Sequence, residues 1–266
     1  MSSRIVVKIG GSILNDESRQ EALVKQIAGL VTDTQKVVVV HGGGKALTSL
    51  LNRLDVPSHF HEGLRITNAE TMDAALMTLA GVVNKKLVAS FAAVGCRAIG
   101  LCGGDGGAVL AQKLEHATVD YGFVGTVSMI NTDLIDLLLR NDYLPVISCV
   151  AMGPDHHYYN INADQMAAAC AVALQADQLV FLTDVDGVLS KERTVLPKIN
   201  PAKVKHLVAD KVVTGGMLPK LNACLAALDG GVGGINILNG SIEDGLKRLI
   251  AQGEPLGTAI GAGAVQ

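Results

Sequence analysis

The chain has 266 residues, of which 49% are hydrophobic and 3% aromatic, so we expect a core of Val, Ile, Leu and Ala. A net charge of −3 gives no electrostatic reason to expect a nucleic acid or an acidic membrane as partner. Five scattered cysteines without a Cys-x-x-Cys pair, and no unbroken apolar run of about 18 residues, favour a soluble, cytoplasmic protein without disulfides or membrane spans.

Short apolar runs typical of strands alternate along the chain with segments of helical periodicity. The runs are residues 4–9, 36–40, 97–101, 144–149, 178–183 and 234–238. This alternation predicts an α/β fold with a mainly parallel sheet. The stretch from Thr67 to Val94 predicts one long helix, either a subunit contact or a core helix, and residues 109–127 predict inserted hairpins. We expect two lobes that share one sheet and divide near residue 175, with a cleft along the strand ends.

The first predicted strand runs directly into glycine. Lys8 lies near its end, and Gly10 and Gly11 follow. Glycines let the backbone turn sharply and bring amide groups close to an anion. The spacing differs from G-x-x-x-x-G-K-[ST], so a phosphate site here would be built differently from a P-loop.

A glycine triplet follows the second predicted strand. Gly42, Gly43 and Gly44 come after His41 and precede a helix that we expect to begin at Lys45. Amide groups at a helix N-terminus can bind a carboxylate or a phosphate, and a flexible turn is the plainer interpretation. A lipase oxyanion hole is excluded, because the chain has no Gly-x-Ser-x-Gly sequence.

Two further segments carry polar side chains suited to an anionic ligand. Arg65, in a short loop before the long helix, can bind a carboxylate through two parallel hydrogen bonds, and a solvated surface arginine fits equally well. Asn160, Asn162 and Asp164 alternate, so in an extended segment they would share one face. Asp164 could also cap the helix expected at 166–174, but capping does not account for the two asparagines.

The last third of the chain contains two candidate nucleotide segments. Residues 183–189 follow an apolar strand and contain an Asp-Gly turn, which could contact a nucleotide and its Mg²⁺ or be a plain β-turn. Residues 214–220 place a glycine pair before Lys220 and a helix expected from Met217 to Asp229. The first amide groups of that helix would face the ligand of the lysine, and a surface lysine is the alternative.

Six segments, in this order, resemble the amino acid kinase family. They are residues 7–11, 41–44, 63–67, 160–164, 183–189 and 215–220, and the resemblance extends from residue 4 to about 260. It implies a three-layer αβα sandwich with an open, mainly parallel central sheet of about eight strands. It also implies an N-terminal lobe, residues 1–175, for amino acid binding and dimerisation, and a C-terminal lobe, residues 176–266, for ATP. One continuous sheet makes this a single domain.

The most similar branch of the family transfers the γ-phosphoryl group of ATP to the side-chain carboxylate of N-acetyl-L-glutamate, the second step of arginine biosynthesis. The resemblance implies that the amino acid is bound by Gly43, Gly44, Arg65 and Asn160. It implies that Lys8 and Lys220 hold the transferring phosphoryl group and that Asp164 orients both lysines. The implied phosphate- and nucleotide-binding residues are Gly10, Gly11, Asp184, Val185, Asp186, Gly187, Val188, Leu189, Val212, Val213 and Thr214. Mg²⁺ would be bound mainly through ATP, without a protein metal site.

The implied chemistry agrees with the side chains present. The acceptor is already an ionised carboxylate at neutral pH, so no general base is required, and no catalytic histidine is evident. The difficulty is to bring an anion to a polyanion, and two lysines, glycine amides and Mg²⁺ all reduce that repulsion.

Several alternatives can be weighed from the residues. Kinases of carrier-bound aminoadipate usually replace the third glycine and the Gly-Leu-Arg segment, so Gly44 and Arg65 favour the free amino acid. Retention of all three charged catalytic positions argues against a non-catalytic sensor. A Rossmann dehydrogenase is disfavoured, because no Gly-x-Gly-x-x-Gly follows the first strand. His59 and His61 would face one way on a strand, but no third metal ligand is visible in the sequence.

Two positions depart from the pattern of the family. Gly104 stands where many relatives carry a lysine, which would loosen its loop, and Ala259 replaces an arginine. Arginine-inhibited members typically carry an additional helix before the first strand. The resemblance therefore implies a homodimer that is insensitive to arginine.

Overall fold

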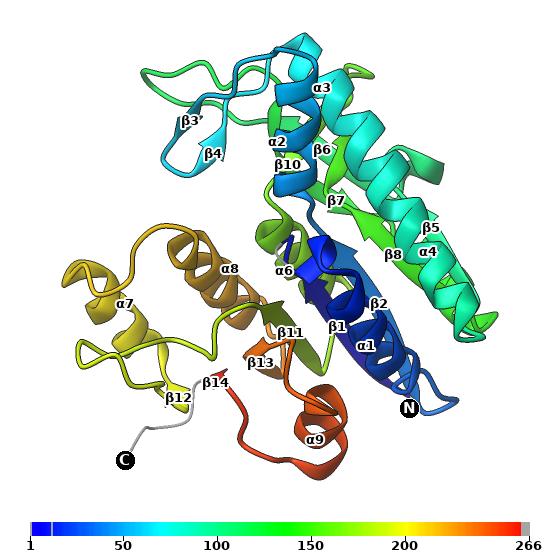
Figure 1. Ribbon diagram of the computed structural model, residues 1–266, viewed down its shortest axis with the longest axis vertical. Helices are drawn as coiled ribbons and strands as arrows, with labels where there is room; N and C mark the ends of the chain where they lie inside the picture. The colour runs from blue at the N-terminus through cyan, green and yellow to red at the C-terminus, as the bar shows by residue number, and fades with distance from the viewer. Residues whose placement is uncertain (1, 12, 262–266) are drawn as a thin grey trace.

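The computed structural model describes residues 2–11 and 13–261, and its centre is an eight-stranded sheet (Figure 1). The strand order is β12-β14-β13-β11-β1-β2-β8-β5. The strands are β1 (Ser3–Ile9), β2 (Gln35–His41), β5 (Ala98–Leu101), β8 (Leu144–Ser148), β11 (Gln178–Thr183), β12 (Lys198–Ile199), β13 (Gly234–Asn239) and β14 (Thr258–Ile260). All neighbouring pairs are parallel except β13 and β14. All six predicted strands and the mainly parallel sheet are therefore confirmed.

Helices cover both faces of this sheet. They are α1 (Glu17–Ala28), α2 (Gly44–Arg53), α3 (Ala69–Ala75), α4 (Asn84–Ala93), α5 (Thr132–Arg140), α6 (Ala163–Ala173), α7 (Pro201–Ala209), α8 (Met217–Asp229) and α9 (Gly245–Gln252). In β1, Val6 packs into the core beneath α5, α6 and α8, whereas Ile5 and Val7 pack into the core beneath α1, α4 and α9. This alternation buries both faces of the strand and confirms the three-layer sandwich.

The long helix predicted between Thr67 and Val94 is continuous from Ala69 to Ala93. Asn68 caps it by accepting a hydrogen bond from the Thr71 backbone N–H at 2.8 Å. Its middle turns, residues 76–83, form a π-helical segment, η2. By length and mean hydropathy, 1.3, this helix could span a membrane. However, Leu87 and Phe91 are buried in the core beneath α1, as in a core helix.

Smaller strands form two further sheets at one end of the molecule (Figure 1). A four-stranded barrel consists of β6 (Val109–Lys113), β7 (Val124–Ile130), β9 (Val150–Met152) and β10 (Tyr158–Ile161), which confirms the inserted hairpin of β6 and β7. A separate short hairpin is formed by β3 (Phe60–His61) and β4 (Leu64–Arg65). Arg65 was expected in a loop and instead lies in this hairpin, because Glu62 and Gly63 adopt positive φ angles of 48° and 80° that form a tight turn.

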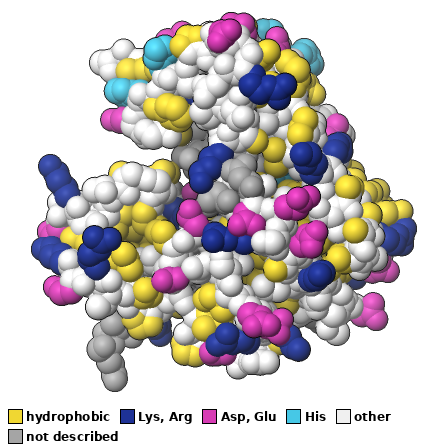
Figure 2. Space-filling model, in the orientation of Figure 1, with side chains coloured by type: hydrophobic (Ala, Val, Ile, Leu, Met, Phe, Trp, Pro, Cys, Tyr) yellow, Lys and Arg dark blue, Asp and Glu magenta, His cyan; other side chains and the backbone are white. Residues whose placement is uncertain are grey.

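The sheet continues across residue 175, because β11 pairs with β1 on one side and with β13 on the other. Figure 2 shows a hollow between the part of the molecule that carries the β3–β4 hairpin and the part that carries α7 and α8. All five cysteines lie within the described residues and are free, as the sequence predicts, and four of them are buried.

Candidate active site

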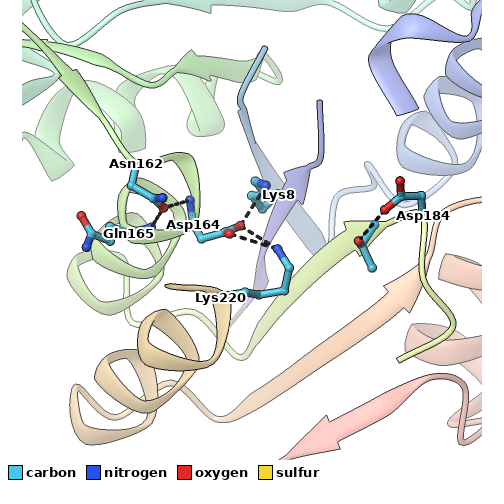
Figure 3. Close-up of polar contacts among 7 residues, drawn as sticks. Lys8, Asn162, Asp164, Gln165, Asp184 and Lys220 are labelled. Carbon is cyan, nitrogen blue, oxygen red and sulfur yellow. Dashed lines mark hydrogen bonds and ion pairs between the residues drawn. The ribbon is translucent and has the colours of Figure 1, made fainter. Parts of the chain in front are cut away.

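Three buried charges from distant parts of the chain meet at the carboxyl end of β1 (Figure 3). The Lys8 Nζ atom lies 2.8 Å from the Asp164 Oδ1 atom. Lys220 Nζ donates to both oxygens of the same carboxylate, at 2.9 and 3.0 Å. Each residue is 6–7% exposed. The structure thus brings together the three residues that the sequence predicts to be catalytic.

The cluster has one negative and two positive charges, so its net charge is positive. Burial raises the pKa of the Asp164 carboxyl, but the ammonium groups of Lys8 and Lys220 outweigh it and keep that pKa below its ordinary value. Burial also lowers the pKa of Lys220, helped by the charge of Lys8 and opposed by Asp164. The carboxylate therefore stays ionised between two ammonium groups and leaves an excess positive charge for an anionic ligand.

Each member of the cluster is held by the end of a secondary-structure element. Lys8 is the penultimate residue of β1, and Lys220 lies in the first turn of α8. Asp164 lies in the first turn of α6 and does not cap it, contrary to one interpretation of the sequence. The cap is Asn162, whose Oδ1 atom accepts hydrogen bonds from the backbone N–H groups of Asp164 and Gln165 at 2.9 and 3.2 Å. The predicted extended row of three polar residues is also wrong, since only Asn160 lies in a strand.

A cavity of about 180 Å³ lies beside the cluster and contains all four predicted amino-acid-binding residues. Its lining comes from the glycine triplet, the β3–β4 hairpin, the π-helical segment and the start of α6. The predicted residues in it are Gly43, Gly44, Arg65 and Asn160. A larger cavity of about 500 Å³ lies between β7, α6 and α8 and contains none of the predicted residues, so size does not identify the site.

Arg65 is a buried cation held by neutral groups. It is 8% exposed, and its guanidinium donates to the hydroxyl groups of Ser58 at 2.6 Å and Thr48 at 2.7 Å. It also donates to the Gly44 carbonyl at 3.4 Å and lies 4.6 Å from the centroid of the Phe60 ring. Burial lowers its pKa. None of the ion pairs within residues 2–11 and 13–261 involves Arg65, so its charge is available to an anion in the cavity.

The glycine triplet contributes differently at each position. A Cβ atom at Gly43 would lie 2.6 Å from Leu79 Cδ2 in the π-helical segment, so the backbone must approach the long helix closely. A Cβ atom at Gly44 would meet nothing within 4 Å, so this residue leaves the cavity open in front of the N-terminus of α2. Gly11 lies against the same backbone, because a Cβ atom there would lie 3.5 Å from the Gly44 N atom.

A buried histidine contacts the glycine triplet. The His41 Nδ1 atom lies 2.8 Å from the Gly42 carbonyl oxygen, and Nε2 lies 3.0 Å from the Asn84 amide nitrogen. These partners require a neutral ring that donates from Nδ1 and accepts at Nε2. Burial is the main cause that lowers the pKa of His41 to about 4. Sequence reasoning missed this support, as it missed Thr48 and Ser58, because no local pattern links the partners.

The predicted nucleotide segment 184–189 begins at Asp184, which lies on the other side of the cluster from Asn162 (Figure 3). Asp184 follows β11 and accepts a hydrogen bond from Thr183 at 3.3 Å (Figure 3). Asn239 donates a hydrogen bond to the Asp186 carboxylate at 2.7 Å and so restrains the turn 184–189. The Val188 N–H also donates to the Thr258 hydroxyl at 2.8 Å. Val212 lines a separate cavity of about 190 Å³ with residues of 190–210. No single described cavity joins these segments to the acceptor residues.

Several other sequence features lie outside the cluster of Lys8, Asp164 and Lys220. His156, His157 and His59 are all exposed. His61 does have potential partners, since Glu62 and His116 lie beside it. In the loop at Gly104, the Asp105 carboxylate accepts a hydrogen bond from the Cys102 backbone N–H at 2.7 Å.

Comparison with known proteins shows the family to which the chain belongs. The model of the amino acid kinase family matches residues 3–239. The chain is 43% identical, over 97% of its length and 98% of the relative, to an acetylglutamate kinase of Koribacter versatilis (strain Ellin345). It is 46% identical, over 88% of its length and 90% of the relative, to an acetylglutamate kinase of Acidobacterium capsulatum. The crystal structure of smu.665 from Streptococcus mutans UA159 matches with a TM-score of 0.82 and 31% identity, over 99% of this chain and 100% of that one. The chain belongs to the amino acid kinase family.

Proposed function

We propose that this protein is an ATP-dependent kinase that phosphorylates the side-chain carboxylate of N-acetyl-L-glutamate, in arginine biosynthesis. One observation carries the proposal. A buried cluster of two lysines and one aspartate has a net positive charge, and Asn162 and Ala163, next to its aspartate, line a small cavity whose arginine has only neutral partners among the described residues. The names of the relatives at 43 and 46% identity support the same activity.

The acceptor would occupy the cavity with its α-carboxylate on Arg65. The guanidinium has a planar set of donors that can bind a carboxylate through two hydrogen bonds. Asn160, whose amide donates to the Thr67 hydroxyl at 3.3 Å, would contact the acetylated end of the acceptor. Gly43 and Gly44 let the acceptor approach the first amide groups of α2, where the helix dipole favours an anion.

The transfer step needs no proton. An oxygen of the acceptor carboxylate forms a bond to the γ-phosphorus of ATP, the bond from that phosphorus to the bridging oxygen breaks, and ADP leaves with the electron pair. Lys8 and Lys220 stabilise the negative charge of the transferring group, and Asp164 keeps both ammonium groups in position. The product is an acyl phosphate, N-acetylglutamyl 5-phosphate.

The nucleotide would bind across residues 176–266, and the acceptor within residues 1–175. Gly10 and Gly11, which follow β1, would contact the phosphates of the nucleotide. Residues 184–189 and 212–214 would line the base and ribose of the nucleotide, since 184–189 follow the end of β11 and Val212 lines a cavity apart from that of the acceptor. Mg²⁺, bound mainly through ATP, supplies further neutralisation of the phosphate charge when present.

A homodimer in the cytoplasm is the form that we propose. Met77 and Val82 are 56% and 55% exposed on the π-helical part of the long helix, and they would be covered by a second copy. Sedimentation of the protein and of Val82→Glu tests this: a dimer that becomes a monomer supports it, and a monomeric native protein contradicts it.

The activity can be tested by trapping the product. The enzyme is incubated with ATP, Mg²⁺ and N-acetyl-L-glutamate in the presence of hydroxylamine, which converts an acyl phosphate to a coloured hydroxamate. Glutamate and N-acetylaspartate serve as parallel acceptors. Hydroxamate formed with N-acetylglutamate and not with the others supports the proposal. No hydroxamate with N-acetylglutamate, while ATP still binds, would favour a sensor or another acceptor.

A further inference from the structure

Two histidines and a glutamate gather at the outer edge of the β3–β4 hairpin. His61 ends β3, Glu62 begins the turn that follows, and His116 comes from the connection between β6 and β7. One potential ligand atom from each of the three lies within 4.8 Å of the others. His61 is half-buried and the other two are exposed, and Figure 2 shows histidine side chains on this edge of the molecule. His61 therefore has two potential fellow ligands, Glu62 from the adjacent turn and His116 from a different segment.

A buried tyrosine holds the two imidazole rings near each other. The rings of His61 and His116 lie 5.8 and 5.6 Å from the ring of Tyr121, and 5.9 Å from one another. Tyr121 is 1% exposed, and its backbone carbonyl accepts a hydrogen bond from the Thr67 N–H at 3.0 Å. The backbone of Glu62 is fixed as well, by its positive φ of 48° in the tight turn. The three side chains therefore do not converge through chance flexibility of one loop.

The donor set is the one that zinc prefers. Zinc is bound by imidazole nitrogen and carboxylate oxygen at about 2.0–2.2 Å, with three protein ligands when a fourth position is left to water. Ligand atoms within 4.8 Å of one another need only small side-chain rotations to reach such bonds, and two of the three side chains are exposed. The Thr118 backbone N–H donates to Nδ1 of His116 at 3.4 Å. When Nε2 binds a metal ion, Nδ1 carries the proton instead and can donate to the Thr118 hydroxyl, which lies 3.5 Å away.

We propose that His61, Glu62 and His116 bind a divalent transition-metal ion of the zinc type. The ion would join the tip of the β3–β4 hairpin to the connection between β6 and β7. The same hairpin carries Phe60 and Arg65, which line the acceptor cavity and pair with each other across the two strands. Metal binding would therefore restrain the segment that positions Arg65. The site itself is independent of the proposed kinase activity.

Binding is measured on the whole protein in the absence of nucleotide, because ATP also binds metals. Titration with Zn²⁺ in a calorimeter gives stoichiometry and affinity, and titration with Co²⁺ gives an absorption spectrum that reports the ligands. We expect one strong site per chain, with a dissociation constant in the micromolar range or below. His61→Ala, Glu62→Gln and His116→Ala should each weaken binding by at least about tenfold.

Matched controls decide whether the binding belongs to this site. His59→Ala removes an exposed histidine from the same segment, and His156→Ala removes one at a distance. Both should bind Zn²⁺ as the native chain does, and all variants should unfold at the native urea midpoint in metal-free buffer. Binding only at millimolar Zn²⁺ would overturn the proposal. An equal loss in His59→Ala and His116→Ala would overturn it too.

Discussion

The buried lysine pair and the buried arginine of this molecule are balanced in opposite ways. Lys8 and Lys220 share an internal counter-ion, Asp164, at 2.8–3.0 Å, whereas Arg65 is surrounded by hydroxyl groups, a carbonyl and an aromatic ring. A cation with its own carboxylate keeps its geometry in the absence of a ligand. A buried cation without one gains most when an anion arrives. The first arrangement suits a catalytic centre and the second suits a binding pocket.

The strongest test removes the counter-ion. Asp164→Asn leaves two buried ammonium groups about 3 Å from a neutral amide, so we expect the free energy of unfolding to fall by about 3–5 kcal/mol. Urea unfolding at neutral pH measures this loss. Asp142→Asn is the matched control, because its ion pair with Lys36 is 66% exposed at the aspartate and should contribute under about 1 kcal/mol. Equal losses in both variants would remove the contrast.

The second test asks whether the paired lysines act on the transition state. Lys8→Met should lower kcat by about 10²–10³, by analogy with the loss of one oxyanion donor, and should change KM for the acceptor little. Lys36→Met, at the exposed ion pair, should leave both constants unchanged. Steady-state assays with N-acetylglutamate measure both. A rise in KM without a fall in kcat would assign Lys8 to binding.

The third test addresses the other cation. Arg65→Lys keeps the charge but loses the planar pair of donors, so we expect KM for the acceptor to rise by about tenfold or more, corresponding to about 1.5–3 kcal/mol. The change in kcat should be much smaller than for Lys8→Met. Arg53→Lys, at the exposed end of α2, is the control. If kcat falls and KM stays the same, the division into catalytic centre and binding pocket is wrong.

The smallest expected effect concerns His41, which contacts the glycine triplet that lines the acceptor cavity. The pKa of His41 is about 4 in the folded protein, below its ordinary value of 6.5. As pH falls below 6.5, the unfolded chain takes up this proton first. The stability present above pH 6.5 is therefore lost as pH falls toward 4, by about 2 kcal/mol at pH 5. Urea unfolding at several pH values measures the loss, and His41→Gln should remove that part of the slope. An unchanged slope would show that other groups cause it.

Much of the fold could be predicted because parallel strands buried on both faces are nearly continuous apolar runs. Five of the six longest strands of the sheet are of this kind, and β5, at the edge of the sheet, is an apolar run that is half-buried. The start of α6 was misplaced, because Asn162 and Asp164 are both residue types that cap helices and lie two positions apart. The π-helical segment had no signal of its own, since its composition is that of the helix around it.

The site could be predicted only through the order of its motifs. Lys8, Asp164 and Lys220 are far apart in sequence, and nothing in their local patterns shows that they meet. The groups that hold Arg65 and the glycine triplet are still less visible, because Thr48, Ser58 and Asn84 are ordinary helix or loop residues. Their role arises from packing between elements, which a single sequence does not display.

The unequal surroundings of Gly43 and Gly44 have a consequence for redesign of the acceptor. The floor of the cavity is shared with the long helix at Gly43, where an added methyl group would press on Leu79. At Gly44 an added methyl group would enter open space, so the room for the acceptor can be trimmed there without moving the scaffold. Of these two adjacent glycines, Gly43 is therefore required by the packing of the long helix, whereas Gly44 is the position at which a substitution can alter substrate choice.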